Sequence, residues 1–359
     1  MAASAKKKLA VLLLAVAAAI AGVMVFRQVL GTSGKTGESA VPRVTTSVLT
    51  LGDGVGLTLA RVGGGRFFMG AGDKEPGAEA DERPLHEVSV SPFWLGATEV
   101  TVAQFAVFVK QSGYGPAKHG AVRSLAVGPQ GLLIEDPGGH SWQDPGFRQE
   151  PDHPVVFVTH FDATAFCLWL SEKTGVEFSL PTEAQWECAA RAGTSSSWHW
   201  GDAPEGGRGF INGPDITARK TFPLFGEIFE FEDGFIRTAP VMSFSPNVAG
   251  LYDMHGNAAE WCADWFDPSW YSKNPEKGTK GPERGVFRVF RGGSWAGIPE
   301  STRSAARAAH FPAVRSNDIG FRVACEKLPP EAAPGPAARP SSGRALPEPS
   351  APSKPAGAP

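Results

Sequence analysis

The sequence predicts a loop-rich, irregular fold of short strands and a few helices, packed on aromatic side chains, rather than a helical bundle. The chain contains 43 glycines and 31 prolines in 359 residues, with 10 tryptophans and few long periodic segments. A hydrophobic fraction of 42% is enough for a substantial core in one large domain or two ordinary ones. The formal net charge of −3 is close to balance, which argues against a nucleic-acid-binding surface.

Residues 1–27 are expected to form a membrane anchor. Three lysines, Lys6 to Lys8, precede an uncharged, mostly apolar run from Leu9 to Phe26. This run reaches the lower limit of about 17–20 residues that a helix needs to cross the bilayer. The basic flank predicts a cytoplasmic N-terminus and places the rest of the chain on the periplasmic side of a bacterial inner membrane. A cleaved signal peptide is the alternative, because Ala19-Ile20-Ala21 resembles a cleavage site, but the apolar run continues past it.

The composition of the chain after residue 27 changes twice and so divides it into three parts. Residues 28–57 contain much Ser, Thr and Gly and are expected to be a flexible linker. Residues 328–359 consist almost entirely of Pro, Ala, Ser and Gly and should form a disordered tail. A single globular domain is therefore expected at 58–327.

Short strands are expected along this domain. Arg61–Gly70 predicts a short hairpin pair in which glycines supply the turn. His86–Val90, Phe93–Gly96 and His153–Val158 have the composition of single strands, and Phe321–Cys325 predicts a closing strand.

Three helices are expected from their capping signals. Thr101 is a predicted N-cap, with Gln104 completing a capping box. Asp162 is expected to cap the second helix, and Thr182 the third, with Gln185 reaching back. Beyond the third helix we expect only short strands and long loops.

The stretch Gly250–Trp265 has the composition of a cation-binding loop. Asp253 and Glu260 flank a run of small residues whose backbone carbonyls can point inward. Calcium prefers such mixtures of carboxylate, amide and carbonyl oxygens. A tight turn before a buried Trp-rich strand is the alternative. A second acidic stretch, Glu232–Phe235, and the preceding Asn212-Gly213 favour the cation site.

Ordered motifs along the chain form a recognisable series. They are Gly64–Gly70, Glu99–Thr101, His153–Val156, Leu180–Glu187, Trp200–Asp202, Gly256–Trp261, Arg291–Trp295 and Asn317–Arg322. With these motifs the chain resembles the formylglycine-generating enzyme, or sulfatase-modifying factor, family. The resemblance implies an α+β fold of C-type-lectin-like, loop-rich character.

The resemblance also implies two structural calcium sites. Asn212, the Gly213 carbonyl, Asp233 and the Phe235 carbonyl match the first; Asp253, the Gly256 and Ala258 carbonyls and Glu260 match the second. The spacing of the acids had already indicated Asp253 and Glu260, so calcium is the expected cofactor.

This sequence lacks the two cysteines that form the family's copper site. Its oxidising members hold copper(I) with two thiolates, three and eight residues after the Ser that matches Ser294. Those positions are Gly297 and Thr302 here, and Trp295–Ser304 contains no Cys, His or Met. Because soft Cu(I) needs soft ligands, copper is not expected.

Two further departures lie near this loop. Ala259 replaces an aromatic residue of the family, and Asp318 replaces an Asn. Ser294, Trp295 and Asp318 remain candidates for lining a groove beside the loop.

The resemblance also implies a disulfide. The family's enzymes bridge the helix that carries Cys167 to the position of Val323, and Cys325 faces the same side of a strand as Val323. Reduced, packed thiols are the alternative.

Two functions follow as hypotheses. The first is an envelope-anchored, calcium-braced accessory or maturation factor that lacks the copper thiolates and binds an exported protein, peptide or glycan. The second is an oxidoreductase-type enzyme that modifies exported polypeptides through a non-standard site. The absent thiolate pair favours the first.

Overall fold

The computed structural model describes residues 44–115, 123–136, 138–273 and 279–335. The expected membrane anchor at 1–27 lies outside these residues. Within them, no helix combines the length and hydrophobicity needed to span a bilayer.

The described residues form an α+β fold, as expected, with four β-sheets among them. Its strands are β1 (Thr46–Gly52), β2 (Val55–Val62), β3 (Gly65–Met69), β4 (His86–Val90), β5 (Phe93–Gly96), β6 (Arg123–Val127), β7 (Leu133–Glu135), β8 (Phe178–Ser179), β9 (Ala259–Trp265), β10 (Arg288–Arg291), β11 (Arg307–His310), β12 (Val314–Ser316), β13 (Ile319–Gly320), β14 (Ala324–Cys325) and β15 (Ala333–Pro334). Its helices are α2 (Val102–Ser112), α3 (His160–Thr174), α4 (Glu183–Arg191), α5 (Ile216–Thr221) and α6 (Trp270–Lys273).

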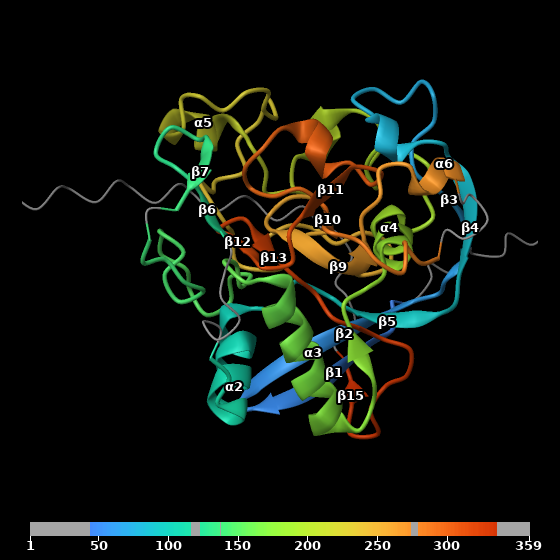
Figure 1. The fold of residues 1–359 in the computed structure, drawn as a ribbon, viewed down its shortest axis with the longest axis vertical. Coiled ribbons are helices and arrows are strands. Elements are labelled where there is room, and N and C mark those ends of the chain that lie inside the picture. The colour runs from blue at the N-terminus through green and yellow to red at the C-terminus, as the bar shows by residue number, and fades with distance from the viewer. Residues whose placement is uncertain (1–43, 116–122, 137, 274–278, 336–359) are drawn as a thin grey trace, which may run out of the picture. The chain divides into compact units, whose positions relative to one another are not determined.

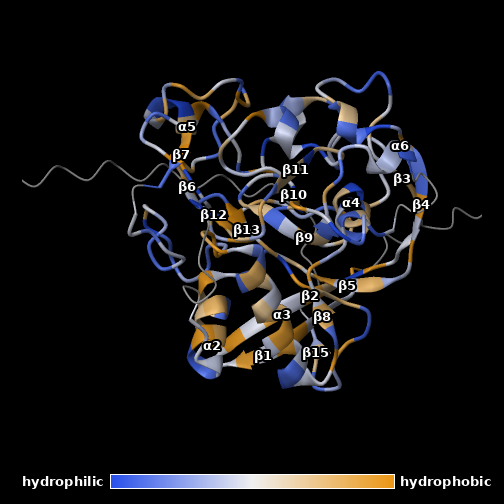
Figure 2. Ribbon diagram, in the orientation of Figure 1, coloured by the Kyte–Doolittle hydropathy of each residue, from blue (hydrophilic) through white to orange (hydrophobic). Residues whose placement is uncertain are grey.

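The largest sheet is antiparallel, with the order β15-β1-β2-β5-β14-β8. Helices α2 and α3 lie beside it (Figure 1). Hydrophobic residues of α2 and β1 stand out in Figure 2, and Leu49, Phe105, Phe166 and Phe321 pack in one core cluster. Burial of this apolar surface is the main contribution to the stability of the sheet and the two helices beside it.

A second sheet, of order β11-β10-β9-β13, positions the candidate site. Strand β9 begins at Ala259, directly after the small-residue turn, and pairs in parallel with β13. Helix α4 packs beside it through Trp186, which lies in a second core cluster with Met254 and Val289. The remaining sheets are β12-β6-β7 and β3-β4.

Two of the three predicted helix caps are confirmed. Thr101 and Thr182 form capping boxes with Gln104 and Gln185. The prediction for the second helix was wrong by three residues: Thr159 is the N-cap, and Asp162 occupies the N3 position of its box. A threonine three residues before an aspartate supports either assignment until the backbone is seen.

Several strand predictions were wrong. Strands β2 and β3 flank Gly63 and Gly64 but do not pair with each other, since β2 pairs with β1 and β5, and β3 with β4. His153–Val158 is not a strand; Val155 and Phe157 donate single hydrogen bonds to Val100 and Ser316. The closing strand is limited to Ala324–Cys325, and α5 and α6 are helices that we did not expect.

The linker prediction at 28–57 was also wrong in part. Strand β1 and the start of β2 lie inside that range, with Ser47, Leu49 and Leu51 buried in alternation. Abundant Ser, Thr and Gly concealed this period of two. Strand β15, inside the expected tail, pairs with β1, and 336–359 lie outside the described residues.

This arrangement predicts different effects for two N-terminal truncations. A chain starting at Val44 retains β1 and β2 and should melt cooperatively. A chain starting at Thr58 loses β1, which lies between β15 and β2 in the largest sheet, together with the first residues of β2. It should lose cooperative melting, because β15 and the remainder of β2 are left without their partner strand. Thermal melting followed by circular dichroism compares the two. Equal melting midpoints would show that β1 is a dispensable linker.

Candidate functional site

The turn before β9 has an unusual backbone. Asp253, Gly256 and Asn257 have φ angles of 56°, 79° and 56°, a left-handed conformation that costs free energy for residues other than glycine. A Cβ on Gly256 would lie 2.1 Å from the Asn212 carbonyl oxygen, and the Asn257 amide donates to that oxygen at 2.7 Å. The turn that carries the second predicted calcium site therefore packs directly against Asn212 of the first predicted site.

The first predicted site has a buried oxygen without a partner. Asn212 donates from Nδ2 to the Arg237 carbonyl and to Asn257 Oδ1, each at 2.9 Å. Its Oδ1 is buried and has no hydrogen-bond partner in the described part of the chain. The amide orientation thus presents an acceptor oxygen, the atom that a hard cation would use.

Asp233 is the carboxylate of this first site. Its two oxygens accept hydrogen bonds from the Gly213 amide at 3.0 Å and the Phe235 amide at 2.7 Å. Burial, together with the neighbouring Asp215 carboxylate, raises the pKa of Asp233 well above its usual range. A buried carboxylate in this state is stabilised by a cation or a proton. The structure thus brings Asn212, Gly213, Asp233 and Phe235 into one region.

Glu260 of the second predicted site is already occupied by protein groups. Arg322 donates from Nη2 to Oε1 at 2.5 Å and from Nε to Oε2 at 2.6 Å, and Trp186 Nε1 donates to Oε2 at 2.8 Å. Glu260 is therefore a buried ion-pair partner whose oxygens are both in use. Asp253 differs, because its Oδ2 accepts from the Met242 amide at 3.0 Å while its buried Oδ1 has no partner among the residues described.

Sequence reasoning missed Glu99 as a member of this site. Its side chain is fully buried, Oε1 accepts from Asn257 Nδ2 at 3.0 Å, and Oε2 has no partner within the described ranges. Burial, and then the Asp253 carboxylate, raise the pKa of Glu99 well above its usual range. The motif Glu99–Thr101 contained this residue, but nothing local to it indicates a position beside Asp253.

The two predicted sites form one connected region through Asn257. Its side-chain amide accepts from Asn212 and donates to Glu99. The unpartnered atoms around it, Asn212 Oδ1, Glu99 Oε2 and Asp253 Oδ1, are all oxygens, the donors that calcium prefers. In the part of the chain described, no three His, Cys, Asp or Glu side chains are grouped to hold a metal, so amide and backbone carbonyl oxygens would have to contribute.

The groove candidates lie mostly inside the protein. Ser294 Oγ donates to Asp318 Oδ2 at 3.0 Å, and Ser316 Oγ donates to the other oxygen of Asp318. Burial raises the pKa of Asp318 above its usual value. Trp295 is 1% exposed and packs against Phe222, so it belongs to the core rather than to a groove rim.

The positions that correspond to copper thiolates cannot bind soft metals. Gly297 has no side chain, and Thr302 is fully buried with its hydroxyl donating to the Pro299 carbonyl at 2.7 Å. Thr302 Oγ1 also accepts from Trp198 Nε1 at 2.9 Å. These residues do not fit copper(I).

All four cysteines are free, so the Cys167–Cys325 bridge is not formed and the reduced alternative is observed. Both thiols are buried. Burial raises the pKa of Cys167 and brings that of Cys325 to about 12, as expected for packed, unreactive thiols.

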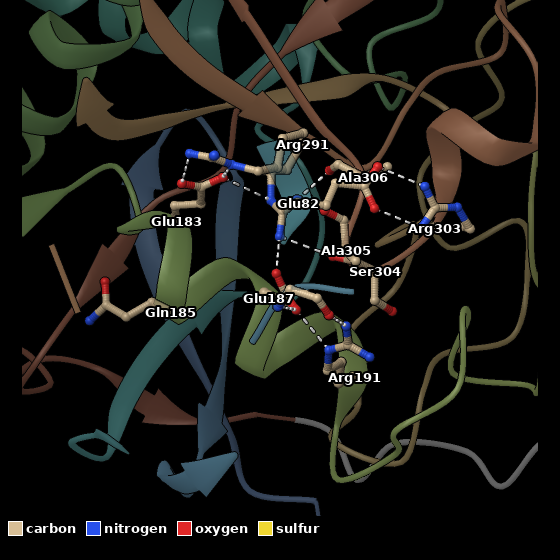
Figure 3. A network of polar contacts seen from close by, with 12 residues as sticks. Glu82, Glu183, Gln185, Glu187, Arg191, Arg291, Arg303, Ser304, Ala305 and Ala306 are labelled. Atoms are coloured by element: carbon tan, nitrogen blue, oxygen red, sulfur yellow. Dashed lines mark hydrogen bonds and ion pairs between the residues drawn. The ribbon is translucent and has the colours of Figure 1, made fainter. Parts of the chain in front are cut away.

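A buried network of ion pairs holds the loop after Ser294 to helix α4 (Figure 3). Arg291 donates to Glu187 and to the carbonyls of Ser304 and Ala305. Further pairs in the network are Glu187–Arg191, Glu183–Arg307 and Glu82–Arg303. Charged hydrogen bonds of this kind fix orientation as well as adding stability. The loop is therefore anchored by arginines instead of metal ligands.

Comparison with known proteins agrees with this fold and these motifs. Residues 57–327 match the family model described as a sulfatase-modifying factor enzyme 1-like domain. The formylglycine-generating enzyme of Streptomyces coelicolor is 37% identical, over 74% of this chain and 88% of its own. The formylglycine-generating enzyme of Thermomonospora curvata is 34% identical, over 75% and 94%. The structure of PvdO from Pseudomonas aeruginosa superposes with a TM-score of 0.62 at 28% identity, covering 78% of this chain and 98% of PvdO.

The chain belongs to the sulfatase-modifying factor family. The resemblance on which the sequence-based expectations rest is thereby confirmed.

Breaking the buried network should destabilise the domain strongly. Glu187→Gln leaves the guanidinium groups of Arg191 and Arg291 short of a buried anion and should cost about 3–5 kcal/mol. The matched control is Glu87→Gln, which breaks an exposed pair with Arg66 and should cost about 0–1 kcal/mol. Urea denaturation measures both. Equal losses would show that the network contributes no more than a surface pair.

Proposed function

We propose that this protein is a calcium-braced family member without the copper oxidase site, which acts as a binding, accessory or maturation factor for exported proteins, peptides or glycans. The observation that carries the proposal is the state of Thr302: a buried hydroxyl with both hydrogen bonds used occupies a position where the family's oxidases carry a thiolate. The oxygen atoms near Asn257, which a calcium ion would need, are present and unpartnered in the described residues.

Calcium would be held by two neighbouring sets of oxygens. Asn212 and Asp233, with the Gly213 and Phe235 carbonyls, form the first. Asp253, with the Gly256 and Ala258 carbonyls, forms the second, to which the unpartnered Glu99 oxygen adds a donor. The ions would supply positive charge to carboxylates that burial otherwise disfavours in their ionised form. Glu260 would contribute indirectly, by fixing Arg322 and the start of β9.

We further propose a membrane-anchored location for the protein and an exported partner. An anchor at 1–27 would tether the domain to the inner membrane, with the globular part on the periplasmic side. A partner there would be an exported protein, peptide or glycan, and the charge balance disfavours nucleic acid. The surface beside Ser294 and Asp318 is the proposed contact region, because the resemblance implies departures from the family's enzymes at Gly297, Thr302 and Asp318.

A second candidate function is enzymatic modification of exported polypeptides at a non-standard site. The hydrogen bond between Ser294 and Asp318, with the raised pKa of that carboxyl, favours it. Both side chains are also bonded within the protein, to Ala296 and Ser316 respectively, so a structural role accounts for them equally well.

Calcium should stabilise the protein in a pH-dependent manner. Burial raises the pKa of Asp253 to about 6, above its unfolded value, so without metal the folded state binds more protons between about pH 4 and 6. Its free energy of unfolding should therefore fall as the pH rises through this range. Because calcium binds the ionised form, the calcium-induced rise in melting temperature should grow from pH 5 to 7 and then level off.

The Asp253→Asn variant tests whether the Asp253 carboxylate causes the pH-dependent stabilisation by calcium. This variant should lose most of the pH-dependent calcium response, since it keeps the size of the side chain but not its charge. Glu260→Gln, which weakens the pair with Arg322, should lower stability with and without calcium. A calcium response that is unchanged in Asp253→Asn would rule out this carboxylate as a ligand.

The absence of oxidase activity is tested directly. Protein loaded anaerobically with Cu(I) is mixed with a peptide containing Cys-x-Pro-x-Arg, and oxygen uptake and peptide mass are followed. We expect no turnover above a protein-free blank, with the Streptomyces coelicolor formylglycine-generating enzyme as the positive control. Conversion of the cysteine to formylglycine would contradict the proposal.

A further inference from the structure

One arginine outside the buried ion-pair network is held by aromatic rings instead of a carboxylate. The Arg237 guanidinium carbon lies 5.3 Å from the centre of the Phe147 ring and 5.2 Å from the centre of the Phe222 ring. The side chain is only partly exposed, and its nitrogens make no hydrogen bond or ion pair with any residue that the structure describes. A partly buried charge without a counter-ion costs free energy, so an anion from outside would find this guanidinium unoccupied.

The buried arginines of the network differ from Arg237 in this respect. Arg291, Arg303 and Arg322 each bind at least one carboxylate of the protein. At Arg237 the protein supplies two rings, which orient a guanidinium without using its N–H groups in conventional hydrogen bonds. The planar fork of donors is therefore free, and a carboxylate matches that fork with two parallel hydrogen bonds.

The two rings belong to the aromatic cluster around Trp295. The centres of the Phe147 and Phe222 rings lie 5.8 and 5.7 Å from that of Trp295. Phe222 is fully buried at the end of α5, so it is a fixed support for the guanidinium. Because Trp295 directly follows Ser294, packed rings connect Arg237 to the proposed contact region.

Exposed aliphatic side chains lie on the same segments as this arginine. Ile236 precedes Arg237, and Leu224 lies in the loop after α5; both are exposed. Ile298, also exposed, lies close to that loop, since a Cβ on Gly226 would be 3.7 Å from its Cγ2. Apolar side chains exposed beside polar groups are typical of protein-binding surfaces. A polypeptide partner is therefore favoured here over a glycan.

We propose that Arg237 binds a carboxylate of an acidic segment of an exported polypeptide through its guanidinium fork. This inference rests on the proposed function, because it assigns the chemistry of the partner to the same contact region. The carboxylate belongs to an acidic side chain of the partner or to its C-terminus. The side chain of Arg237 serves this site, whereas its backbone carbonyl accepts from Asn212 of the calcium region.

Peptide binding by the full-length protein tests the proposal. The probes are short fluorescein-labelled peptide libraries with randomised Leu, Val and Ser around a central residue. The centre is Glu with an amidated C-terminus, Gln with an amidated C-terminus, or Gln with a free C-terminus. Fluorescence anisotropy is recorded at about 0.15 M salt, where long-range attraction between charges is screened. At least one carboxylate-containing library should bind at least tenfold more tightly than the neutral one, because charge-assisted hydrogen bonds are the stronger ones.

Two arginine variants separate the site from a general effect of charge. Arg237→Gln should abolish the preference for carboxylate-containing peptides. Arg61→Gln is the matched control: it removes a guanidinium that lies 5.8 Å from the centre of the Trp94 ring on another part of the surface, and it should keep the preference. Thermal melting verifies that both variants fold.

The outcomes distinguish this inference from the proposed function. Equal binding of all three libraries, or an undiminished preference in Arg237→Gln, would overturn the role of Arg237 but still support a peptide-binding protein. Binding of oligogalacturonate, an acidic glycan, without binding of any peptide would also overturn it. No binding of any of these probes would count against both proposals.

A second variant decides the matter if Arg237→Gln fails to fold. Arg237→Lys keeps the positive charge but not the planar donor fork. It should bind the preferred library at least threefold more weakly than the parent protein does, and an unchanged affinity would contradict recognition by the fork. Preference for the free C-terminus over the Glu library would identify the chain end as the source of the carboxylate.

Discussion

The docking of the turn at 253–257 onto Asn212 is the constraint on which the rest of the site depends. Three left-handed residues in this turn are held in place by contacts with distant parts of the chain. The Asn257 side chain then joins Asn212 to Glu99. This geometry leaves oxygen atoms, rather than amide hydrogens, unpartnered in the interior. The same turn leads into β9, so a displacement here would disturb both sets of oxygen atoms.

A second constraint is the arginine-rich anchoring of the loop after Ser294. Arg291 and Arg303 are almost fully buried and bind carboxylates on α4 and near β4. Buried ion pairs of this kind fix one arrangement, because removing either partner leaves an uncompensated charge. The loop thus retains a defined conformation although Gly297 and Thr302 offer no soft ligand. Family membership is therefore compatible with two positions that offer no soft metal ligand.

The parts of the fold that depend on neighbours in sequence were predictable. The boxes at Thr101 and Thr182 need only residues three positions apart, and the small-residue turn before β9 is a local pattern. The composition of residues 46–57 concealed β1, because its polar residues alternate with buried leucines. Here the pattern was present but the overall Ser, Thr and Gly content dominated its interpretation.

Long-range partners could not be predicted from the sequence. Glu260 carried the expected spacing for a calcium ligand, but its oxygens bind Arg322 and Trp186, which approach from other segments. Glu99 has no local pattern that indicates its neighbours, since its role comes from a tertiary contact with Asn257. Trp295 similarly became a core residue because α5 and the loop after it cover it.

The most direct measurement is an isothermal titration of calcium into chelator-treated protein, with the melting temperature recorded before and after. Saturable binding at stoichiometric calcium, accompanied by a higher melting temperature, is the result predicted from the unpartnered oxygens around Asn257. No binding heat and a melting temperature indifferent to calcium would contradict the account, because those buried carboxylates would then be stabilised in the folded protein without a cation.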